Sequence, residues 1–325
     1  MFTKLPELFD RNFAIGYFLP VASFTSATIA LLSYFSLLPA IFTVNTVNQI
    51  DILLGTTLIG LFSWLAGIIL LATNRDLIRI LEGYGNFNPL NLVMWVERRN
   101  YKSLEKSIMK LNGEYINVLN DNNEFPTALR LERNRLMRLR ASRFPDREEY
   151  LLPTSFGNTI RAFESYSRIM YGIDAIPGWE RLLTVIPETY IKLINDAKTL
   201  VDFWVNIFSL SFLFGVEYML FILTIKQFPP LWIIIVTIVT MVIAYQQAVG
   251  LAVEWGGLVK SAFDVYLPEL REKLALNTYS DLSTERLVWL KLSQSFIYHD
   301  PESMPERQLH DKDETTPKNT KVEIS

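Results

Sequence analysis

The sequence predicts an all-α, polytopic membrane protein with four transmembrane helices in two hairpins and a helical cytoplasmic domain. Of its 325 residues, 50% are hydrophobic, and the mean hydropathy is +0.20. These apolar residues lie in long charge-free runs rather than at regular intervals, which excludes a purely soluble chain. No stretch shows sustained strand-like alternation. The 31 Lys and Arg against 34 Asp and Glu give no general attraction to nucleic acid.

The first two spans lie near the N-terminus. Residues 12–50 carry no charge, and residues 13–42 supply more than the about 20 apolar residues that a spanning helix needs. Residues 52–73 form a second uncharged run. The first run is far longer than the about 7–15 apolar residues of a signal peptide, so we expect a retained anchor. Residues 13–73 are therefore assigned to a first transmembrane hairpin, in which Pro20 and Pro39 are expected to kink or end the first helix.

The third and fourth spans follow much later in the chain. Residues 203–225 are apolar except for Asn206 and Glu217, and residues 231–251 form the last apolar run. Runs of this length can satisfy their backbone hydrogen bonds in lipid only as helices. Residues 226–230 read as a tight turn, so residues 201–251 are assigned to a second transmembrane hairpin.

Lys and Arg set the predicted orientation. Residues 74–200 hold 19 of them and the chain after residue 251 holds 9, whereas the short loops between paired spans hold one at most. Arg75 and Arg79 lie directly against the second span, and Lys192 and Lys198 against the third. Because such residues stay on the cytoplasmic side of short loops, both termini and the middle segment are predicted to be cytoplasmic, in the inner (plasma) membrane of the cell.

The cytoplasmic parts read as helices with one polar tail. Within the domain at residues 74–200, Gly83 and Gly85 end the extension of the second span, and helices are expected at 90–98, 103–119, 128–143 and 155–171. A further helix begins at Pro187 and continues into the third span. Residues 1–12 form a cytoplasmic N-terminus, residues 252–299 amphipathic helices, and residues 300–325 a disordered tail.

Glu217 is the most informative polar residue, because an ionisable side chain within a span costs a few kcal/mol. It lies about eight residues, or about 12 Å, from the outer end of its helix. Thr237 and Thr240 stand at similar depth on the fourth span. Two interpretations stay open: Glu217 titrates, binds a cation or lines a path, or its protonated carboxyl bonds those threonines and holds the helices together.

A second polar layer combines Asn206 with Gln246 and Gln247. Asn206, with Ser209 and Ser211 near it, is expected to face the depth of Tyr245 and the two glutamines. An interhelical hydrogen-bond network is favoured over a pore lining.

The predicted helix at residues 128–143 is strongly basic, with one acid, Glu132. Its arginines are distributed all round the axis, which argues against a helix lying in the membrane plane. No aromatic residues are interleaved with them, which argues against nucleic acid. We therefore expect a solvated helix near anionic lipid headgroups, formed by Arg130, Arg133, Arg135, Arg138, Arg140 and Arg143.

No enzymatic or cofactor site is predicted. The chain has no G-x-S-x-G, P-loop or H-E-x-x-H pattern and no Cys, which excludes disulfides, thiolate metal sites and cysteine nucleophiles. Glu306, His310 and Glu314 have helical spacing, but the composition of the tail argues against a helix and hence against a metal. A cytoplasmic ion-pair cluster, favoured as structural rather than catalytic, is predicted from Arg161, Glu164, Asp174, Glu180 and Arg181.

Five short segments carry a resemblance. They are Leu-Glu-Gly-Tyr-Gly at 81–85, Arg-Phe-Pro-Asp at 143–146, Leu-Leu-Pro-Thr-Ser-Phe-Gly-Asn-Thr-Ile-Arg-Ala-Phe-Glu at 151–164, Tyr-Gly-Ile-Asp-Ala at 171–175 and Trp-Glu-Arg-Leu at 179–182. Through them the chain resembles an uncharacterised family of prokaryotic four-span integral membrane proteins, over roughly the second span through Tyr298. The resemblance implies a membrane fold and no particular activity.

The leading hypothesis is a non-enzymatic, membrane-anchored sensing, binding or scaffold protein, homo-oligomeric in the lipid bilayer, with an unidentified cytoplasmic partner and no cofactor. The alternative is an oligomeric ion channel or small-solute transporter, and a membrane-bound enzyme comes third. The order of hairpin, insert and hairpin is similar to that of bestrophin-like anion channels in topology alone, because the pore motifs of that family are absent.

Overall fold

The computed structural model describes residues 10–35, 37, 49–85, 88–120, 126–225 and 230–306. Within these ranges the regular structure is helical and no strand occurs, so the predicted all-α class is confirmed there. The chain forms two compact units, Met1–Tyr166 with Pro187–Ser261 and Ser167–Ile186 with Ala262–Ser325.

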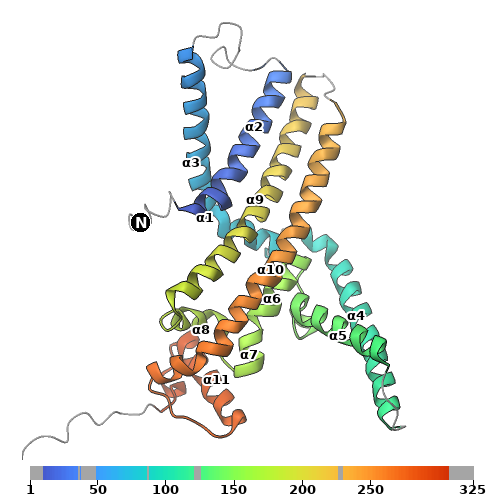
Figure 1. Cartoon of the computed structure of the whole chain (residues 1–325), viewed down its shortest axis with the longest axis vertical. Helices are drawn as coiled ribbons and strands as arrows, with labels where there is room; N and C mark the ends of the chain where they lie inside the picture. Colours follow the sequence, from blue (N-terminus) through green and yellow to red (C-terminus); the bar gives the residue numbers. More distant parts are fainter. Residues whose placement is uncertain are drawn as a thin grey trace, which may run out of the picture. The chain divides into compact units, whose positions relative to one another are not determined.

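Four helices of the described chain are long and apolar enough to cross a membrane, as predicted. The first is continuous through α1 (Arg11–Phe13), the π-helical segment η3 (Ala14–Phe18) and α2 (Leu19–Tyr34). The others are α3 (Gln49–Glu82), α9 (Glu188–Ile225) and α10 (Trp232–Lys273). In the first unit α2, α3, α9 and the start of α10 run side by side (Figure 1). Pro39 and residues 226–229 of the turn predicted at 226–230 lie outside the described residues.

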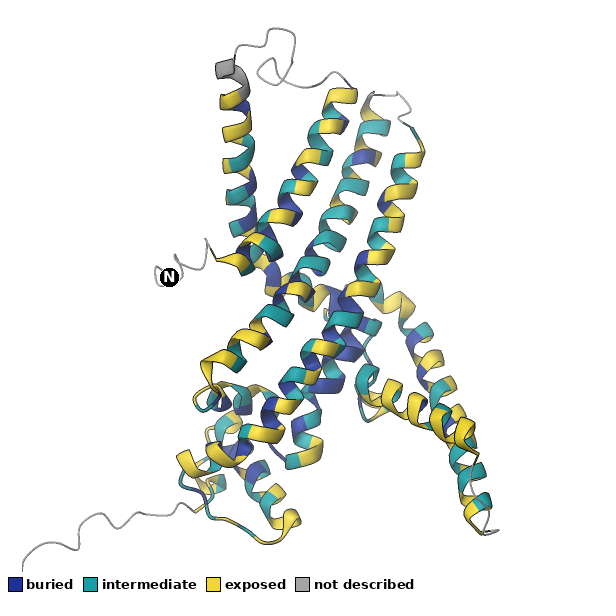
Figure 2. Cartoon of the chain, in the orientation of Figure 1, coloured by how far each residue is buried: buried dark blue, intermediate teal, exposed yellow. Residues whose placement is uncertain are grey.

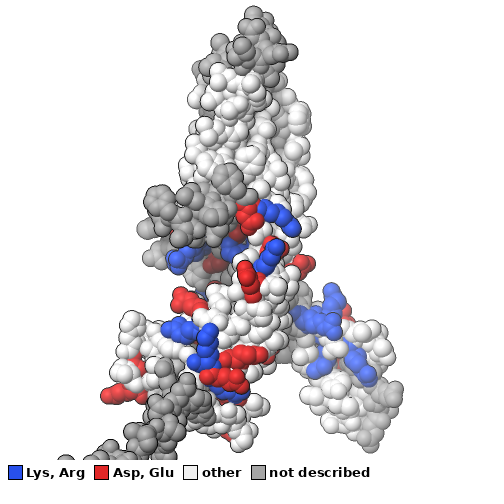
Figure 3. All heavy atoms as spheres, turned by 60° about the vertical axis from the view of Figure 1, so that its left-hand side comes forward, with Lys and Arg blue, Asp and Glu red and all other residues white. Residues whose placement is uncertain are grey.

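The apolar parts of these helices expose large hydrophobic side chains. Leu53 is 68% exposed and Leu223 70%, and Ile69, Phe62 and Ile235 are also exposed. Exposed and half-buried residues follow these helices for most of their length (Figure 2). On the face drawn in Figure 3, this apolar part shows no Lys, Arg, Asp or Glu. A contiguous apolar surface of this kind is typical of contact with lipid rather than water.

The π-helical segment η3 packs the N-terminal helix against two other helices. Gly16 and Gly67 permit this approach, because a Cβ on Gly16 would lie 3.3 Å from Thr199 Cγ2 and one on Gly67 would lie 3.2 Å from Phe13 Cζ. A small core of Phe13, Tyr17, Val21 and Leu70 fills the contact. Pro20 does not end the helix as expected; it follows the wider π-helical turn and occupies the first turn of α2.

The rest of the first unit is built on the charged end of α3. The helix ends at Glu82, before Gly83 at φ +98°, as the sequence predicts. Then come η5 (Pro89–Val93), α4 (Met94–Asn120), α5 (Thr127–Arg143), η6 (Glu148–Tyr150) and α6 (Ser155–Glu164). One helix, α4, replaces the two expected at 90–98 and 103–119, and the helix expected at 155–171 breaks after Glu164.

The second unit packs short helices around its own core. It contains most of α7 (Tyr166–Tyr171), α8 (Ala175–Leu182), the last turns of α10, α11 (Leu282–Tyr298) and η7 (Pro301–Ser303). Gly172 has φ +86°, and a Cβ there would lie 2.2 Å from the Arg286 carbonyl oxygen. The buried side chains include Leu182, Phe263, Trp289 and Leu292. Residues 307–325 of the predicted disordered tail, with His310 and Glu314, lie outside the described residues.

Candidate functional site

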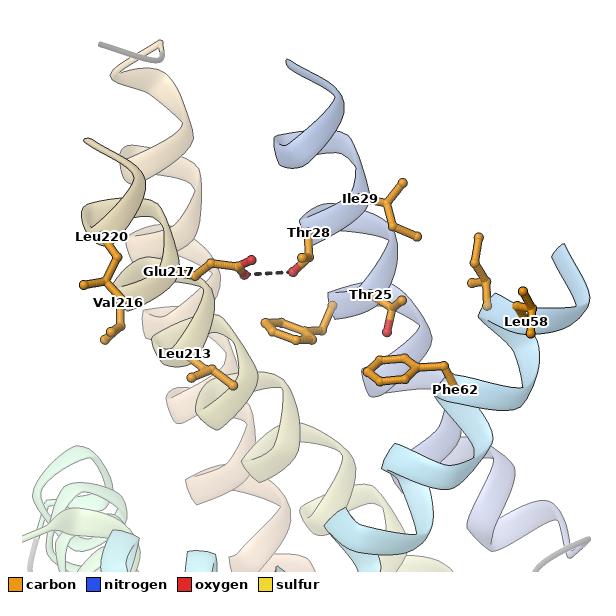
Figure 4. Close-up of a pocket in the computed structure, with 11 residues that line it drawn as sticks. Thr25, Thr28, Ile29, Leu58, Phe62, Leu213, Val216, Glu217 and Leu220 are labelled. Carbon is orange, nitrogen blue, oxygen red and sulfur yellow. Dashed lines mark hydrogen bonds between the residues drawn. The ribbon is translucent and has the colours of Figure 1, made fainter. Parts of the chain in front are cut away.

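A pocket of about 650 Å³ lies between α2, α3 and α9, and Glu217 is its single ionisable residue (Figure 4). The consecutive helices α2 and α3 and the distant helix α9 supply its walls, so the pocket exists only in the assembled bundle. Apart from Glu217, its only polar residues are Thr25 and Thr28 of α2. The full lining is Phe24, Thr25, Thr28, Ile29, Leu58, Ile59, Phe62, Leu213, Val216, Glu217 and Leu220.

The polar groups of this pocket are incompletely satisfied. Thr28 Oγ1 donates a hydrogen bond of 2.8 Å to Glu217 Oε2. Thr25 is 7% exposed, and its Oγ1 is buried without a hydrogen-bond partner. The ion pairs of the described chain all involve other acids, so no Lys, Arg or His neutralises Glu217. A carboxyl group in an apolar wall thus has one hydroxyl donor and no cationic partner.

The interpretation in which Glu217 bonds Thr237 and Thr240, one of the two left open by the sequence, does not match the contacts of the described chain. Gly215 is the α9 residue that faces Thr237, at 3.7 Å from the Thr237 Cγ2 to a Cβ built on the glycine. Glu217, two residues on, is turned by about 200° on the helix and faces α2. Thr237 donates to its own backbone at the Ile233 carbonyl oxygen. Both threonines line a separate pocket of about 210 Å³ with Ser23 and Ser211.

Asn206 belongs to a buried network that joins α9 to the N-terminal helix. Its Nδ2 donates to the Gly16 carbonyl oxygen at 2.8 Å, and Asp202 accepts from Tyr17 Oη and Lys198 Nζ, both at 2.7 Å. Asp202 is 3% exposed, so the two donors are what make burial of its carboxylate tolerable.

The layer predicted from Asn206, Gln246 and Gln247 is therefore corrected. Gln246 and Gln247 are exposed on α10, and the Asn206 amide turns to η3 instead. Tyr17, Lys198 and Asp202 were not predicted as members of a site. The spacing of Lys198, Asp202 and Asn206 at four residues was the available signal, since it puts the three side chains on one face of a helix.

The start of α6 ties three helices of the first unit together. Thr154 Oγ1 donates to the Leu81 carbonyl oxygen at 2.7 Å and accepts from Gly157 N at 2.9 Å. Buried Glu97 of α4 accepts from Ser155 Oγ at 2.7 Å and from Asn158 Nδ2 at 2.9 Å. The Tyr245 hydroxyl of α10 accepts from Phe156 N at 3.3 Å. We call residues 151–158 the junction, because they bond the last turn of α3, the first turn of α4 and an interior residue of α10.

The predicted five-residue ion-pair cluster does not form within one unit. Arg161 and Glu164 belong to the first unit, where the Arg161 guanidinium donates to the Tyr84 hydroxyl. Burial raises the pKa of Glu164 above its ordinary range, and the nearby Arg161 partly opposes that rise. Burial likewise raises the pKa of Tyr84.

The other three members of that predicted cluster lie in the second unit. Arg181 is 3.9 Å from Glu180 and stacks over Phe296, with 3.5 Å from its Cζ to the ring centroid. Asp174 precedes α8, and its backbone N–H donates to Ser293 Oγ at 2.9 Å. These contacts hold α8 against α11 and assemble no catalytic group.

Several arginines of the basic helix α5 make contacts within the first unit. Arg140 donates to Glu105 at 2.6 Å, to the Tyr101 hydroxyl at 2.9 Å and to the Asp146 carbonyl oxygen at 2.8 Å. Arg133 bonds Asn112, and Arg135 pairs with Glu132 of its own helix. The contact of Arg130, Arg138 and Arg143 with lipid headgroups stays a prediction.

Two further findings bear on the chemistry. Within the described ranges, no group of three His, Asp or Glu residues is placed to hold a metal ion. Comparison with protein-family models, curated proteins and solved structures found no match for this chain. The function is therefore argued from the site alone.

Proposed function

We propose that this chain is a multi-pass protein of the inner (plasma) membrane that binds a molecule in the Glu217 pocket and passes the binding event to a cytoplasmic helical body. The two pairs of apolar helices form two hairpins, and residues 74–200 with both termini lie in the cytoplasm. The concentration of Lys and Arg directly beyond the apolar runs supports this orientation.

The observation that carries the proposal is the continuity of α9. Its 38 residues rise about 57 Å, against about 30 Å of hydrocarbon in a bilayer. The same rigid helix carries Glu217 in the pocket and, slightly more than four turns earlier, Asp202 in the network with Tyr17. A displacement of α9 at the pocket therefore reaches its charged end without a flexible joint.

Such a displacement is expected to change the hydrogen bonds of the junction. Residues 154–158 bond α3, which lines the pocket, and also α4 and α10. A change in the spacing of the apolar helices must change these hydrogen bonds, whose donors and acceptors are largely buried.

Hydrogen exchange of the full chain in nanodiscs tests the coupling. Leu58→Trp fills the pocket, and we expect altered protection of backbone amides at residues 151–158. Leu61→Trp is the matched control, because Leu61 lies one turn further along α3, is exposed and does not line the pocket. Equal protection in Leu58→Trp, Leu61→Trp and the natural chain would contradict the coupling.

The orientation has its own test, which the absence of Cys makes simple. Cysteine introduced at Arg138 is then the sole thiol, and we expect a membrane-impermeant maleimide to label it in permeabilised but not in intact cells. Labelling in intact cells would overturn the orientation.

One observation favours a channel as the second candidate. Gln246 and Gln247 are exposed on the apolar part of α10, where lipid contact is costly for amides. In a symmetric homo-oligomer these residues would line a wetted axis. Ion flux in liposomes that survives both Gln246→Ala and Glu217→Ala would remove this candidate.

A further inference from the structure

We infer that the Glu217 pocket binds an amphiphile with a protonated amine head and an unbranched apolar chain, taken up from the bilayer. The inference rests on the proposed function, in which this pocket is the ligand site, and it names the class of ligand. It is carried by the charge, hydrogen-bonding capacity and lining of the pocket.

The charge of the pocket selects a cation. A carboxylate in an apolar environment must be paired or protonated, and the described chain offers Glu217 no cationic side chain. An anionic lipid head would place like charge against the Glu217 carboxylate, and a neutral alcohol would bind only with Glu217 protonated. An ammonium group supplies the missing charge.

The hydrogen-bonding capacity selects a donor. Thr28 already donates to Oε2 of Glu217, so Oε1 still has its lone pairs available. Thr25 Oγ1 belongs to the same wall, but the atom is itself buried and offers no surface to a ligand. An alkylammonium carries three N–H donors and no acceptor, which suits the available lone pairs of the Glu217 carboxylate.

The remainder of the lining selects an apolar chain. Eight of the eleven lining residues are Leu, Ile, Val or Phe. A volume of about 650 Å³ falls within the about 300–1,000 Å³ of small-molecule sites, and such sites combine apolar walls with a few polar groups. Since the walls belong to the apolar parts of α2, α3 and α9, the ligand enters from the hydrocarbon and not from water.

Photolabelling tests the inference on the full chain in nanodiscs of zwitterionic lipid. The probe is a hexadecylamine that carries a diazirine on its chain, with the matching diazirine hexadecanol as a second probe. We expect the amine to label peptides of α2, α3 and α9, and unlabelled hexadecylamine to compete at least about tenfold better than hexadecanol, which corresponds to about 1.4 kcal/mol.

Variants locate the head group. Glu217→Gln keeps the shape and the Thr28 contact but removes the charge, so amine labelling should fall about tenfold while hexadecanol labelling stays the same. Thr25→Val should leave amine labelling unchanged, because Thr25 Oγ1 is buried. Thr224→Val is a second control and should also change nothing, because Thr224 is exposed on α9, the helix of Glu217, and donates to its own backbone.

The outcomes separate the ligand class from the proposed function. If both probes label the pocket equally and Glu217→Gln does not discriminate between them, the amine is overturned while the pocket remains a binding site. If neither probe labels α2, α3 or α9 and Leu58→Trp leaves the junction unchanged, the ligand class and the proposed function both fail.

Discussion

Tyr17 and Asp202 lie 185 positions apart in the chain, yet the Tyr17 hydroxyl donates a hydrogen bond of 2.7 Å to Asp202 Oδ2. The bond fixes the π-helical turn of the N-terminal helix to α9 immediately before the apolar run that begins at Phe203. Lys198 Nζ donates to the same Asp202 oxygen, also at 2.7 Å, and to Oδ1 at 3.0 Å. The N-terminal helix therefore cannot slide along α9 without uncovering a buried charge.

Tyr17→Phe should lower the free energy of unfolding by about 1–3 kcal/mol, because it leaves a buried acceptor with one donor fewer. Reversible unfolding in mixed micelles measures the change. Tyr34→Phe is the control: its ring is exposed, so we expect a change within about 0.5 kcal/mol. Equal effects of the two substitutions would mean that the Tyr17 bond contributes nothing.

Gly157→Ala tests the contact of α6 with the end of α3. A Cβ at Gly157 would lie 2.2 Å from the Glu82 carbonyl oxygen, and backbone cannot yield as a side chain can. We expect a loss of at least about 1–3 kcal/mol, the usual cost of overpacking.

The matched control for that substitution is Gly113→Ala in α4. A Cβ at Gly113 has no neighbour within 4 Å, so the higher helix propensity of Ala should stabilise the chain by up to about 1 kcal/mol. If both alanine variants unfolded at the same midpoint, α6 would not be packed against α3 as described.

The sequence predicted the apolar helices because their signals are local. The four apolar helices and the unbroken passage from Pro187 into α9 follow from charge-free runs and one first-turn proline. The short helix α8 was not predicted, because it contains Pro177 and Gly178, residue types with low helix propensity. In the structure Pro177 occupies the first turn, where its missing N–H costs nothing, and a Cβ on Gly178 would crowd Ile173 at 2.9 Å.

The sequence indicated Glu217 as a candidate residue but did not indicate which side chain it contacts. The cost of an acid in a span identified Glu217, whereas the identity of its partner depended on which helix faces it. Depth along a span is readable from sequence, but rotation about the helix axis is set by packing, here by Gly215 against α10. Tyr17 was not predicted, because no periodic pattern in the sequence marks the π-helical turn that places its hydroxyl beside Asp202.

The raised pKa of Glu164 predicts a dependence of stability on pH. The folded chain keeps this proton to higher pH than the unfolded chain, whose carboxyl titrates near the ordinary 4.5. Between the two pKa values the unfolded state binds fewer protons, so the free energy of unfolding falls as pH rises. Glu164→Gln should flatten this decline in pH-dependent unfolding. Glu180→Gln, with a side chain 76% exposed, should leave the decline as it is.

Arg140→Lys should loosen the pairing of α5 with α4. The guanidinium bonds the Glu105 carboxylate, the Tyr101 hydroxyl and the Asp146 carbonyl oxygen, and it stacks 5.2 Å from the centroid of the Tyr101 ring. A lysine keeps the charge but cannot reach three acceptors in a planar fork, so we expect a loss of about 1.5–3 kcal/mol. Arg135→Lys is the control, because the Arg135 side chain is 68% exposed and its pair with Glu132 is screened by solvent. Limited proteolysis of the two variants provides a second readout, and faster cleavage between α4 and α5 is expected in Arg140→Lys alone. Equal cleavage of both would show that charge, and not the geometry of the guanidinium, holds the two helices together.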